Sequence, residues 1–153
     1  MPQDIDIGWL AGIIDGEGCL TARMHYDKRD NRTRVGVRVN VSNSDVKVIN
    51  KIRRVLDDLE VHYSVQERKP AKSSWKTVYH VDIQAYADVR KVLVHTINHL
   101  ASNKKEIADA MLVYTQRRLS HGMGPLTDID NIEVLHIREL CSKYNKHIVK
   151  GGE

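Results

Sequence analysis

Two acidic residues at the end of a glycine-containing helix are the side chains best suited to chemistry. Residues 10–18 read LAGIIDGEG, so Asp15 and Glu17 directly follow an apolar stretch. Carboxylates are disfavoured at a helix C-terminus, where the helix dipole is already negative. A bound divalent cation would reverse that penalty, and magnesium prefers carboxylate, phosphate and water oxygens. The pattern suits a magnesium site that acts on phosphates, although such a pair is also a common surface feature or cap.

The same helix contains glycines where alanine would be more stable. Gly8 and Gly12 are four residues apart and therefore share one helix face. Each interior glycine costs about 1 kcal/mol relative to alanine. Close approach of another helix backbone would compensate for that cost. The alternative is a core helix that is loosely optimised.

The surrounding sequence predicts the elements that must position these residues. The apolar period predicts a helix over 4–15 that Gly16 and Gly18 end. Alternating residues predict strands over 19–25 and 34–43, joined by a basic turn. Further elements are expected as helices over 45–59, 86–100, 103–118 and 130–148 and strands over 63–69 and 76–84. The order predicts an α+β fold with one sheet of about four strands.

Composition places the chain among globular proteins with a basic surface. The 153 residues are 41% hydrophobic and 29% charged, which suits one domain with its own core. The formal charge of +4 is a modest indication of a polyanionic partner, and much of it lies in residues 23–38 and 68–76. A solvated loop face is the alternative. Cys19 and Cys141 are expected to be reduced thiols.

Residues 10–18 resemble the LAGLIDADG motif. Ile13, Gly16 and Glu17 are substitutions of a kind that the family accepts. The predicted element order over about residues 5–118 resembles the αββαββα family fold, with a saddle-shaped antiparallel sheet. We therefore expect a single LAGLIDADG endonuclease domain over 1–153 with a C-terminal helical extension over about 126–149. The positions identical to the motif are Leu10, Ala11, Gly12, Ile14, Asp15 and Gly18.

The resemblance implies a site-specific homing endonuclease. Such an enzyme makes double-strand breaks in a long pseudo-palindromic DNA site by metal-dependent phosphodiester hydrolysis, and is intron- or intein-associated. A single motif implies a homodimer on double-stranded DNA, with no small-molecule cofactor and no membrane association. The motif helices of the two subunits would pack through Gly8, Ala11, Gly12 and Asp15.

The resemblance also implies roles for individual residues. Glu17 would coordinate Mg²⁺, with the backbone carbonyl of Gly16 as a further ligand; Mn²⁺ is expected to substitute, and Ca²⁺ to support binding without cleavage. Asp15 has either a metal-related or a helix-ending role. Asn43 and Lys47 correspond in element order to residues around the attacking water. Lys104 corresponds to a lysine near the scissile phosphate, with Lys105 as its rival.

The polar strand faces and basic loops are the predicted DNA interface. Arginine and lysine suit guanine edges, and asparagine and glutamine suit adenine. Loop charges hold phosphates and carry no sequence information. The expected phosphate contacts are Lys28, Arg29, Arg32, Lys69 and Lys72. The expected base readers are Thr21, Arg23, His25, Arg34, Arg38, Asn40, Gln66 and Arg68, followed by Lys76 and Tyr79.

Several alternatives stay open at this stage. An RNA maturase or a non-catalytic DNA-binding regulator could share the fold, although the intact acidic pair argues mildly against the maturase. His95 and His99 are four apart on a predicted helix but lack a third zinc ligand. The absence of a membrane span and of a signal sequence predicts an intracellular protein, with organelle and prokaryotic cytoplasm both open.

Overall fold

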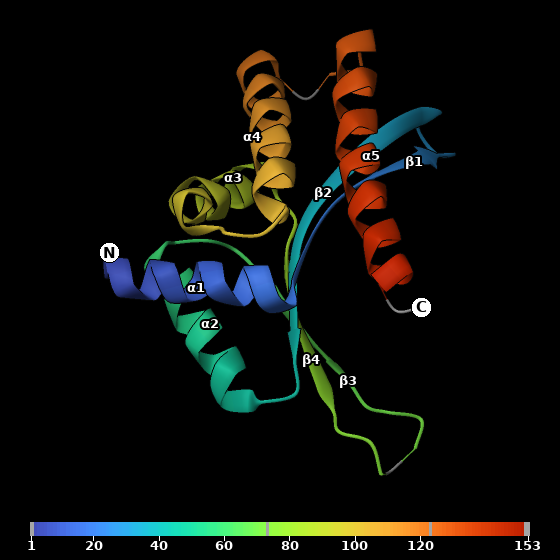
Figure 1. The fold of residues 1–153 in the computed structure, drawn as a ribbon. Helices are drawn as coiled ribbons and strands as arrows, with labels where there is room; N and C mark the ends of the chain where they lie inside the picture. Colours follow the sequence, from blue (N-terminus) through green and yellow to red (C-terminus); the bar gives the residue numbers. More distant parts are fainter. Residues whose placement is uncertain (1, 73, 123, 152–153) are drawn as a thin grey trace.

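The computed structural model describes residues 2–72, 74–122 and 124–151, and it has the predicted element order (Figure 1). The predicted α+β class with a four-stranded antiparallel sheet is confirmed. No helix in these ranges is both long enough and apolar enough to cross a membrane. The elements are α1 (Asp4–Glu17), β1 (Gly18–Asp27), β2 (Arg32–Asn43), α2 (Val46–Asp58), β3 (Ser64–Arg68), β4 (Val78–Ile83), α3 (Tyr86–Thr96), the 3-10 turn η1 (Ile97–His99), α4 (Lys104–His121) and α5 (Asp128–Gly151).

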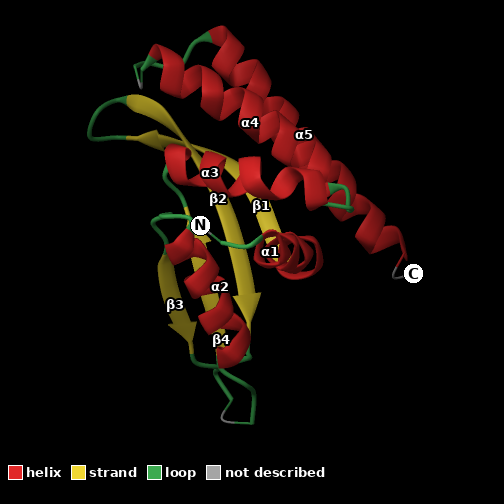
Figure 2. Ribbon diagram, turned by 90° about the vertical axis from the view of Figure 1, so that its left-hand side faces the viewer, coloured by secondary structure: helices red, strands yellow, loops and turns green. Residues whose placement is uncertain are grey.

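The sheet has the order β1-β2-β4-β3, with helices covering one of its faces. β1 and β2 form a long hairpin that runs from the Gly18–Val41 pair to the Asp27–Arg32 pair. On its β2 side, β4 pairs with the last five residues of β2, Val39–Asn43, so the β1–β2 hairpin extends beyond the rest of the sheet. Figure 2 shows α1, α2 and α3 in front of the strands. The opposite face is left for polar residues.

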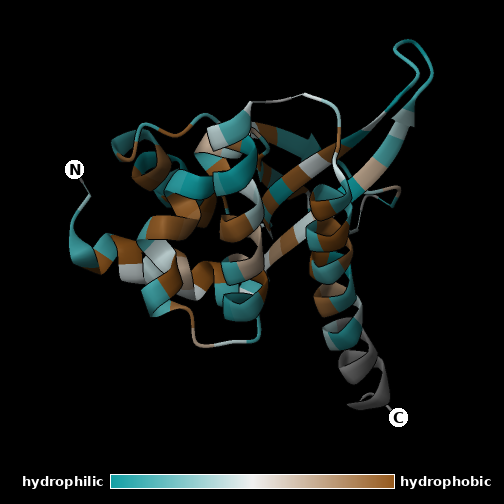
Figure 3. Cartoon of the chain, turned by 90° about the horizontal axis from the view of Figure 1, so that it is seen from above, coloured by the Kyte–Doolittle hydropathy of each residue, from teal (hydrophilic) through white to brown (hydrophobic). Residues whose placement is uncertain are grey.

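The core lies between the sheet and the helices. Val37, Val39 and Val41 of β2 are buried, as the two-residue period of a strand predicts. Leu10 and Ile14 of α1 are buried on the same side of the sheet. In Figure 3 the hydrophobic positions of the helices gather toward the interior. Each fully buried aliphatic side chain stabilises the fold by about 1.5–3 kcal/mol.

α1 passes into β1 without an intervening loop, and Gly18 makes that possible. A Cβ on Gly18 would lie 2.6 Å from the carbonyl oxygen of Ile14, so only glycine fits. The backbone N–H of Gly18 donates to that carbonyl. The prediction that Gly16 also ends the helix was wrong, because α1 continues to Glu17. A helical glycine costs only about 1 kcal/mol, so Gly16 alone does not stop the helix.

The last helix, α5, packs against α4 and against the edge strand β1. Val134 and Ile137 are fully buried, and the thiol of Cys141 donates to the carbonyl of Leu20 at 3.3 Å. Both cysteines are free thiols, as predicted.

A buried carboxylate holds the start of α5 to α4. Asp130 is fully buried and accepts from Arg117 at 2.5 Å, Arg118 at 3.2 Å and the backbone N–H of Thr127 at 2.7 Å. Burial raises the pKa of Asp130, but the hydrogen bonds from Thr127 and Arg117 outweigh it and hold that pKa below its usual value. Asp130 is therefore ionised at neutral pH.

Replacing Asp130 with alanine is expected to destabilise the protein by about 3–5 kcal/mol, because both arginines lose their buried partner. Thermal unfolding of the variant measures the loss. Asp128→Ala is the matched control, since Asp128 is exposed at the start of the same helix. Equal melting temperatures for the two variants would contradict a structural role for Asp130.

Candidate active site and nucleic-acid interface

The ends of α1 and β2 bring Glu17 and Asn43 together. The side-chain amide of Asn43 donates a hydrogen bond to the Glu17 carboxylate. The side-chain oxygen of Asn43 accepts a hydrogen bond from the backbone N–H of Asp45 at 2.7 Å, which fixes the orientation of the Asn43 amide. Glu17 itself is exposed at the end of its helix. Two residues that lie 26 positions apart in sequence therefore form one polar corner.

Lys104 reaches the same corner from the start of α4. Its Nζ donates to the backbone carbonyl of Asp15 at 2.6 Å, which places a positive charge at the negative end of α1. Lys105 is exposed, and its backbone N–H donates to Ser102. Lys47 is exposed in the first turn of α2, and the structure gives its side chain no hydrogen bond within the described ranges. Of the two rival lysines, Lys104 is the one placed against the motif helix.

Asp15 serves as a clamp between α1 and the start of α4. Its carboxylate accepts from the backbone N–H of Ala101 at 2.8 Å and of Ser102 at 3.2 Å, and from the Ser102 hydroxyl. Burial raises the pKa of Asp15, but these hydrogen bonds and the charge of Lys104 outweigh it and lower that pKa. Both carboxylate oxygens thus have hydrogen-bond partners within the chain, which gives Asp15 a structural role between the two helices.

Glu17 is consequently the carboxylate that this corner can offer to a cation. In residues 2–72, 74–122 and 124–144, whose side chains the structure describes, no group of three or more His, Cys, Asp or Glu could hold a metal ion. His95, one of the two histidines considered as zinc ligands, has its ring Nδ1 2.7 Å from the backbone carbonyl oxygen of Lys91 in the same helix, which is a hydrogen-bonding distance. Magnesium commonly takes only one or two protein carboxylates and completes its shell with phosphate and water. Glu17 is exposed and can supply one such carboxylate.

The outer face of α1 has open space around its glycines. A Cβ added to Gly8, Gly12 or Gly16 would meet no atom within 4 Å. Ile5 on the same face is 75% exposed. Packing within this chain therefore does not explain the glycines. The predicted interface position of Ala11 needs correction: it is fully buried and faces its own core, because it lies beside Leu10 and Ile14 on the inner side of α1.

The polar face of the sheet carries most of the predicted base readers. Thr21 lies directly opposite Arg38, and His25 lies opposite Arg34, so these side chains share one face. Arg34 is paired with Asp27 at 3.2 Å and with Asp30. Other predicted DNA contacts are exposed on β1, at the start of β2, on β3 and in the connecting loops: Arg23, Arg32, Gln66, Arg68, Lys28, Arg29, Lys69, Lys72 and Lys76.

The prediction that Tyr79 reads DNA was wrong, because this residue lies on the opposite face of β4. Because side chains alternate along a strand, Tyr79 points to the same face of β4 as Val81 and Ile83, and it packs against the core. His80 and Asp82 occupy the polar face instead. The strand register around residues 77–80 was ambiguous in sequence, and a one-residue shift moves every side chain to the other face.

Sequence reasoning missed Arg138 of α5. It lines a hollow of about 300 Å³ together with Thr21 and Arg23 of β1 and Arg38 and Asn40 of β2. No local pattern marks it, since its position depends on how α5 packs along β1. The last helix thus both covers the core and brings a guanidinium to the polar face.

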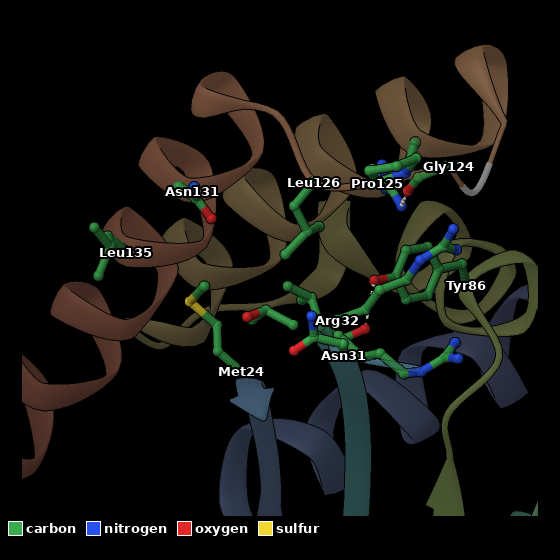
Figure 4. Close-up of a pocket in the computed structure, with 13 residues that line it drawn as sticks. Met24, Asn31, Arg32, Tyr86, Gly124, Pro125, Leu126, Asn131 and Leu135 are labelled. Atoms are coloured by element: carbon green, nitrogen blue, oxygen red, sulfur yellow. Dashed lines mark hydrogen bonds between the residues drawn. The ribbon is translucent and has the colours of Figure 1, made fainter. Parts of the chain in front are cut away.

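A larger cavity, of about 790 Å³, lies elsewhere, between the tip of the β1–β2 hairpin and the α4–α5 connection (Figure 4). Arg32, Tyr86 and Leu126 are among its lining residues. None of the candidate metal ligands or catalytic residues lines it. This cavity is therefore separate from the corner at the end of α1.

The family model of the LAGLIDADG-like domain matches residues 4–96. The chain belongs to this family. The resemblance of residues 10–18 to the LAGLIDADG motif is thereby confirmed. Among curated proteins, none matches the sequence.

Solved structures of LAGLIDADG-type endonucleases share the fold. The homing endonuclease I-CvuI, in complex with a DNA target, is 16% identical with a TM-score of 0.62, covering 91% of this chain and 79% of that one. The LAGLIDADG homing endonuclease I-GzeII, in complex with a DNA target, is 14% identical with a TM-score of 0.63, and the match covers 88% of this chain and 43% of that one. The archaeal intron-encoded homing endonuclease I-Vdi141I, in complex with DNA, is 16% identical with a TM-score of 0.53, and the match covers 94% of this chain and 99% of that one. The predicted homing-endonuclease fold is confirmed.

The Asp15 clamp predicts a pH-dependent contribution to stability. Because its folded pKa lies below the unfolded value of about 3.9, the contribution is complete above that value and is lost as pH falls through the folded pKa. Asp15→Ala is expected to lower the free energy of unfolding by about 1–3 kcal/mol at pH 7. Denaturant titrations from pH 7 to pH 2 measure this difference. A difference that stays constant over this range would argue against the ionised clamp.

Proposed function

We propose that this chain is one subunit of a homodimeric homing endonuclease that cuts both strands of a pseudo-palindromic DNA site. The observation that carries the proposal is the corner at the end of α1, where Asn43 donates to Glu17 and Lys104 donates to the carbonyl of Asp15, beside a basic, polar sheet face. The family match and the DNA-bound structures of I-CvuI, I-GzeII and I-Vdi141I support it. Association with an intron or intein is part of the proposal.

One chain offers half of the catalytic centre. Glu17 is exposed at the end of α1, while Asp15 is engaged within the chain. A twofold axis beside α1 would bring two copies of Glu17 together and give the pair of carboxylates that phosphodiester cleavage on two strands requires. The open space at Gly8, Gly12 and Gly16 allows a second helix backbone to approach closely. The dimer is therefore expected to form through the motif helix.

Magnesium would be held by Glu17 and the Gly16 carbonyl of each subunit, where it would polarise a phosphate oxygen and favour hydroxide at neutral pH. Structures of relatives obtained with magnesium and with calcium support the use of divalent cations. Asn43 restrains the Glu17 carboxylate and thereby sets the direction of its oxygens. Lys104 brings a fixed positive charge that offsets negative charge developing on the phosphate. Lys47 follows Asn43 at the start of α2 and is proposed to contact the attacking water.

DNA would lie along the polar face of the sheet. Thr21, Arg23 and His25 on β1 reach one part of the major groove, and Gln66 and Arg68 on β3 reach another. Arg138 adds a contact from α5. The exposed loop lysines and arginines hold phosphates, which positions the protein without reading sequence.

A maturase or a non-catalytic DNA-binding regulator is the alternative function. Either would keep the basic sheet face and would not depend on Glu17. The exposed carboxylate beside Asn43 and Lys104 favours the nuclease.

Glu17→Gln is expected to reduce DNA cleavage at least about a hundredfold, because the amide is a poor magnesium ligand. DNA binding should persist, since the substitution leaves the predicted DNA contacts of the sheet face unchanged. The measurement is sequencing of the ends cut from a randomised duplex library, with magnesium and with chelator. Glu139→Gln, on the exposed surface of α5, is the matched control. Binding without cleavage by the unmodified protein would move the assignment to a regulator or maturase.

Gly12→Leu is expected to abolish dimers and cleavage while leaving the monomer folded. A Cβ at position 12 meets nothing within 4 Å outside the local helix, and a leucine side chain there would occupy the space of a second helix. Analytical ultracentrifugation and thermal unfolding separate the two effects. Asp109→Leu adds the same side chain to the exposed surface of α4 as a control. Unchanged dimers in Gly12→Leu would exclude this face as the interface.

A further inference from the structure

A buried carboxylate lies in the middle of the basic sheet face. Asp82 of β4 is 2% exposed and pairs across the strands with Asn40 of β2 and Ser64 of β3. An acidic residue is unfavourable on a surface that binds a polyanion, and a buried charge is costly unless it is paired. Its presence therefore calls for a role within the face.

Asp82 binds two of the predicted base readers through one oxygen. Arg38 donates from Nε at 2.5 Å and Asn40 donates from its amide nitrogen at 2.7 Å, both to Oδ1. Burial raises the pKa of Asp82, but the hydrogen bonds from Arg38 and Asn40 outweigh it and lower that pKa. The carboxylate is thus charged at neutral pH and orders both side chains.

The network continues along β2 to a second residue of β4. The Ser42 hydroxyl donates to the amide oxygen of Asn40 at 3.1 Å and lies 2.5 Å from Nδ1 of His80. Asn40 therefore has one neighbour for its nitrogen and one for its oxygen. A carboxylate accepts hydrogen bonds only from the nitrogen, so Asp82 excludes the flipped amide. The orientation of Asn40 is fixed before any ligand arrives.

The same contact orients Arg38 for a guanine edge. Its side chain is 42% exposed, and Nε is engaged by Asp82. Within the described ranges the structure gives no hydrogen bond from its two terminal nitrogens. These form the end of the guanidinium fork, whose paired N–H groups match the O6 and N7 acceptors of guanine. Fixing the fork in advance avoids the entropy of ordering a long side chain on binding.

We infer that Asp82 is a specificity-determining positioning residue. It does not contact DNA itself; it sets Arg38 to select guanine and Asn40 to select adenine. Arg38 and Asn40 are two residues apart on one strand, which separates their Cα atoms by about 6.6 Å, so they contact base pairs one or two steps apart. By neutralising Arg38 in part, Asp82 also weakens its attraction to phosphates of any sequence. This inference rests on the proposed function, because it requires the sheet face to read DNA.

The test compares selection from a randomised duplex library by the unmodified protein, Asp82→Asn and Ser42→Ala. Asp82→Asn is expected to lower discrimination about tenfold at the two positions in each half-site that Arg38 and Asn40 read, because a good bidentate contact discriminates at least about fivefold. Affinity for random DNA should rise. Ser42→Ala removes the hydroxyl contacts to Asn40 and to His80 but leaves the Arg38–Asp82 contact in place, so of the two positions it should affect only the one that Asn40 reads.

Asp88→Asn is the matched control, because Asp88 is also a buried aspartate but lies on α3, away from the sheet face. Thermal unfolding of every variant identifies losses due to misfolding. Unchanged preference at all positions in Asp82→Asn and Ser42→Ala would overturn the inference while leaving the proposed function intact. If Asp82→Asn unfolds, Ser42→Ala decides alone. No sequence preference in the unmodified protein would overturn both.

Discussion

The junction of α1 with the start of α4 controls the position of the candidate catalytic groups. Asp15 accepts hydrogen bonds from residues 101 and 102, and Lys104 donates to the carbonyl of Asp15. These contacts join Asp15 to residues more than 85 positions later in the sequence, in the short connection from η1 to α4 and at the first residue of α4. If they were broken, the end of α1 would lose its partner, and Glu17 and Lys104 would no longer share a corner. The contacts that join α1 to the start of α4 therefore also set where the proposed catalytic groups lie.

The two acidic residues of the motif have divided roles. Asp15 is held by backbone and hydroxyl donors, so it acts within the chain. Glu17 is exposed, and among the described residues its carboxylate is held by Asn43 alone, which suits the proposed role as a cation ligand. Gly18 contributes to this division, because the close contact with Ile14 turns the chain into β1 immediately after Glu17. The carboxylate is thereby fixed at the boundary between helix and sheet.

The polar sheet face combines attraction with restraint. Arginines and lysines supply the positive charge that attracts a polyanion, but charge alone does not select a sequence. Asp82 with Arg38, and Asp27 with Asp30 around Arg34, oppose that attraction and limit the freedom of the guanidinium groups. An interface built in this way gives up some electrostatic affinity in return for fixed donor and acceptor directions. Arg138 shows that the last helix also takes part in this surface.

The sequence by itself determined the element order, the family and the corner residues, since these follow from local periodicity and a contiguous motif. It predicted through the family resemblance that Glu17, Asn43 and Lys104 would belong together; in the structure Asn43 donates to Glu17, and Lys104 donates to the carbonyl of Asp15, two residues before Glu17. Only the tertiary structure decided the facing of Tyr79, the burial of Ala11, the clamp made by Asp15 and the place of Arg138. Each depends on strand register or on helix packing across distant segments, and no local pattern of residues encodes those.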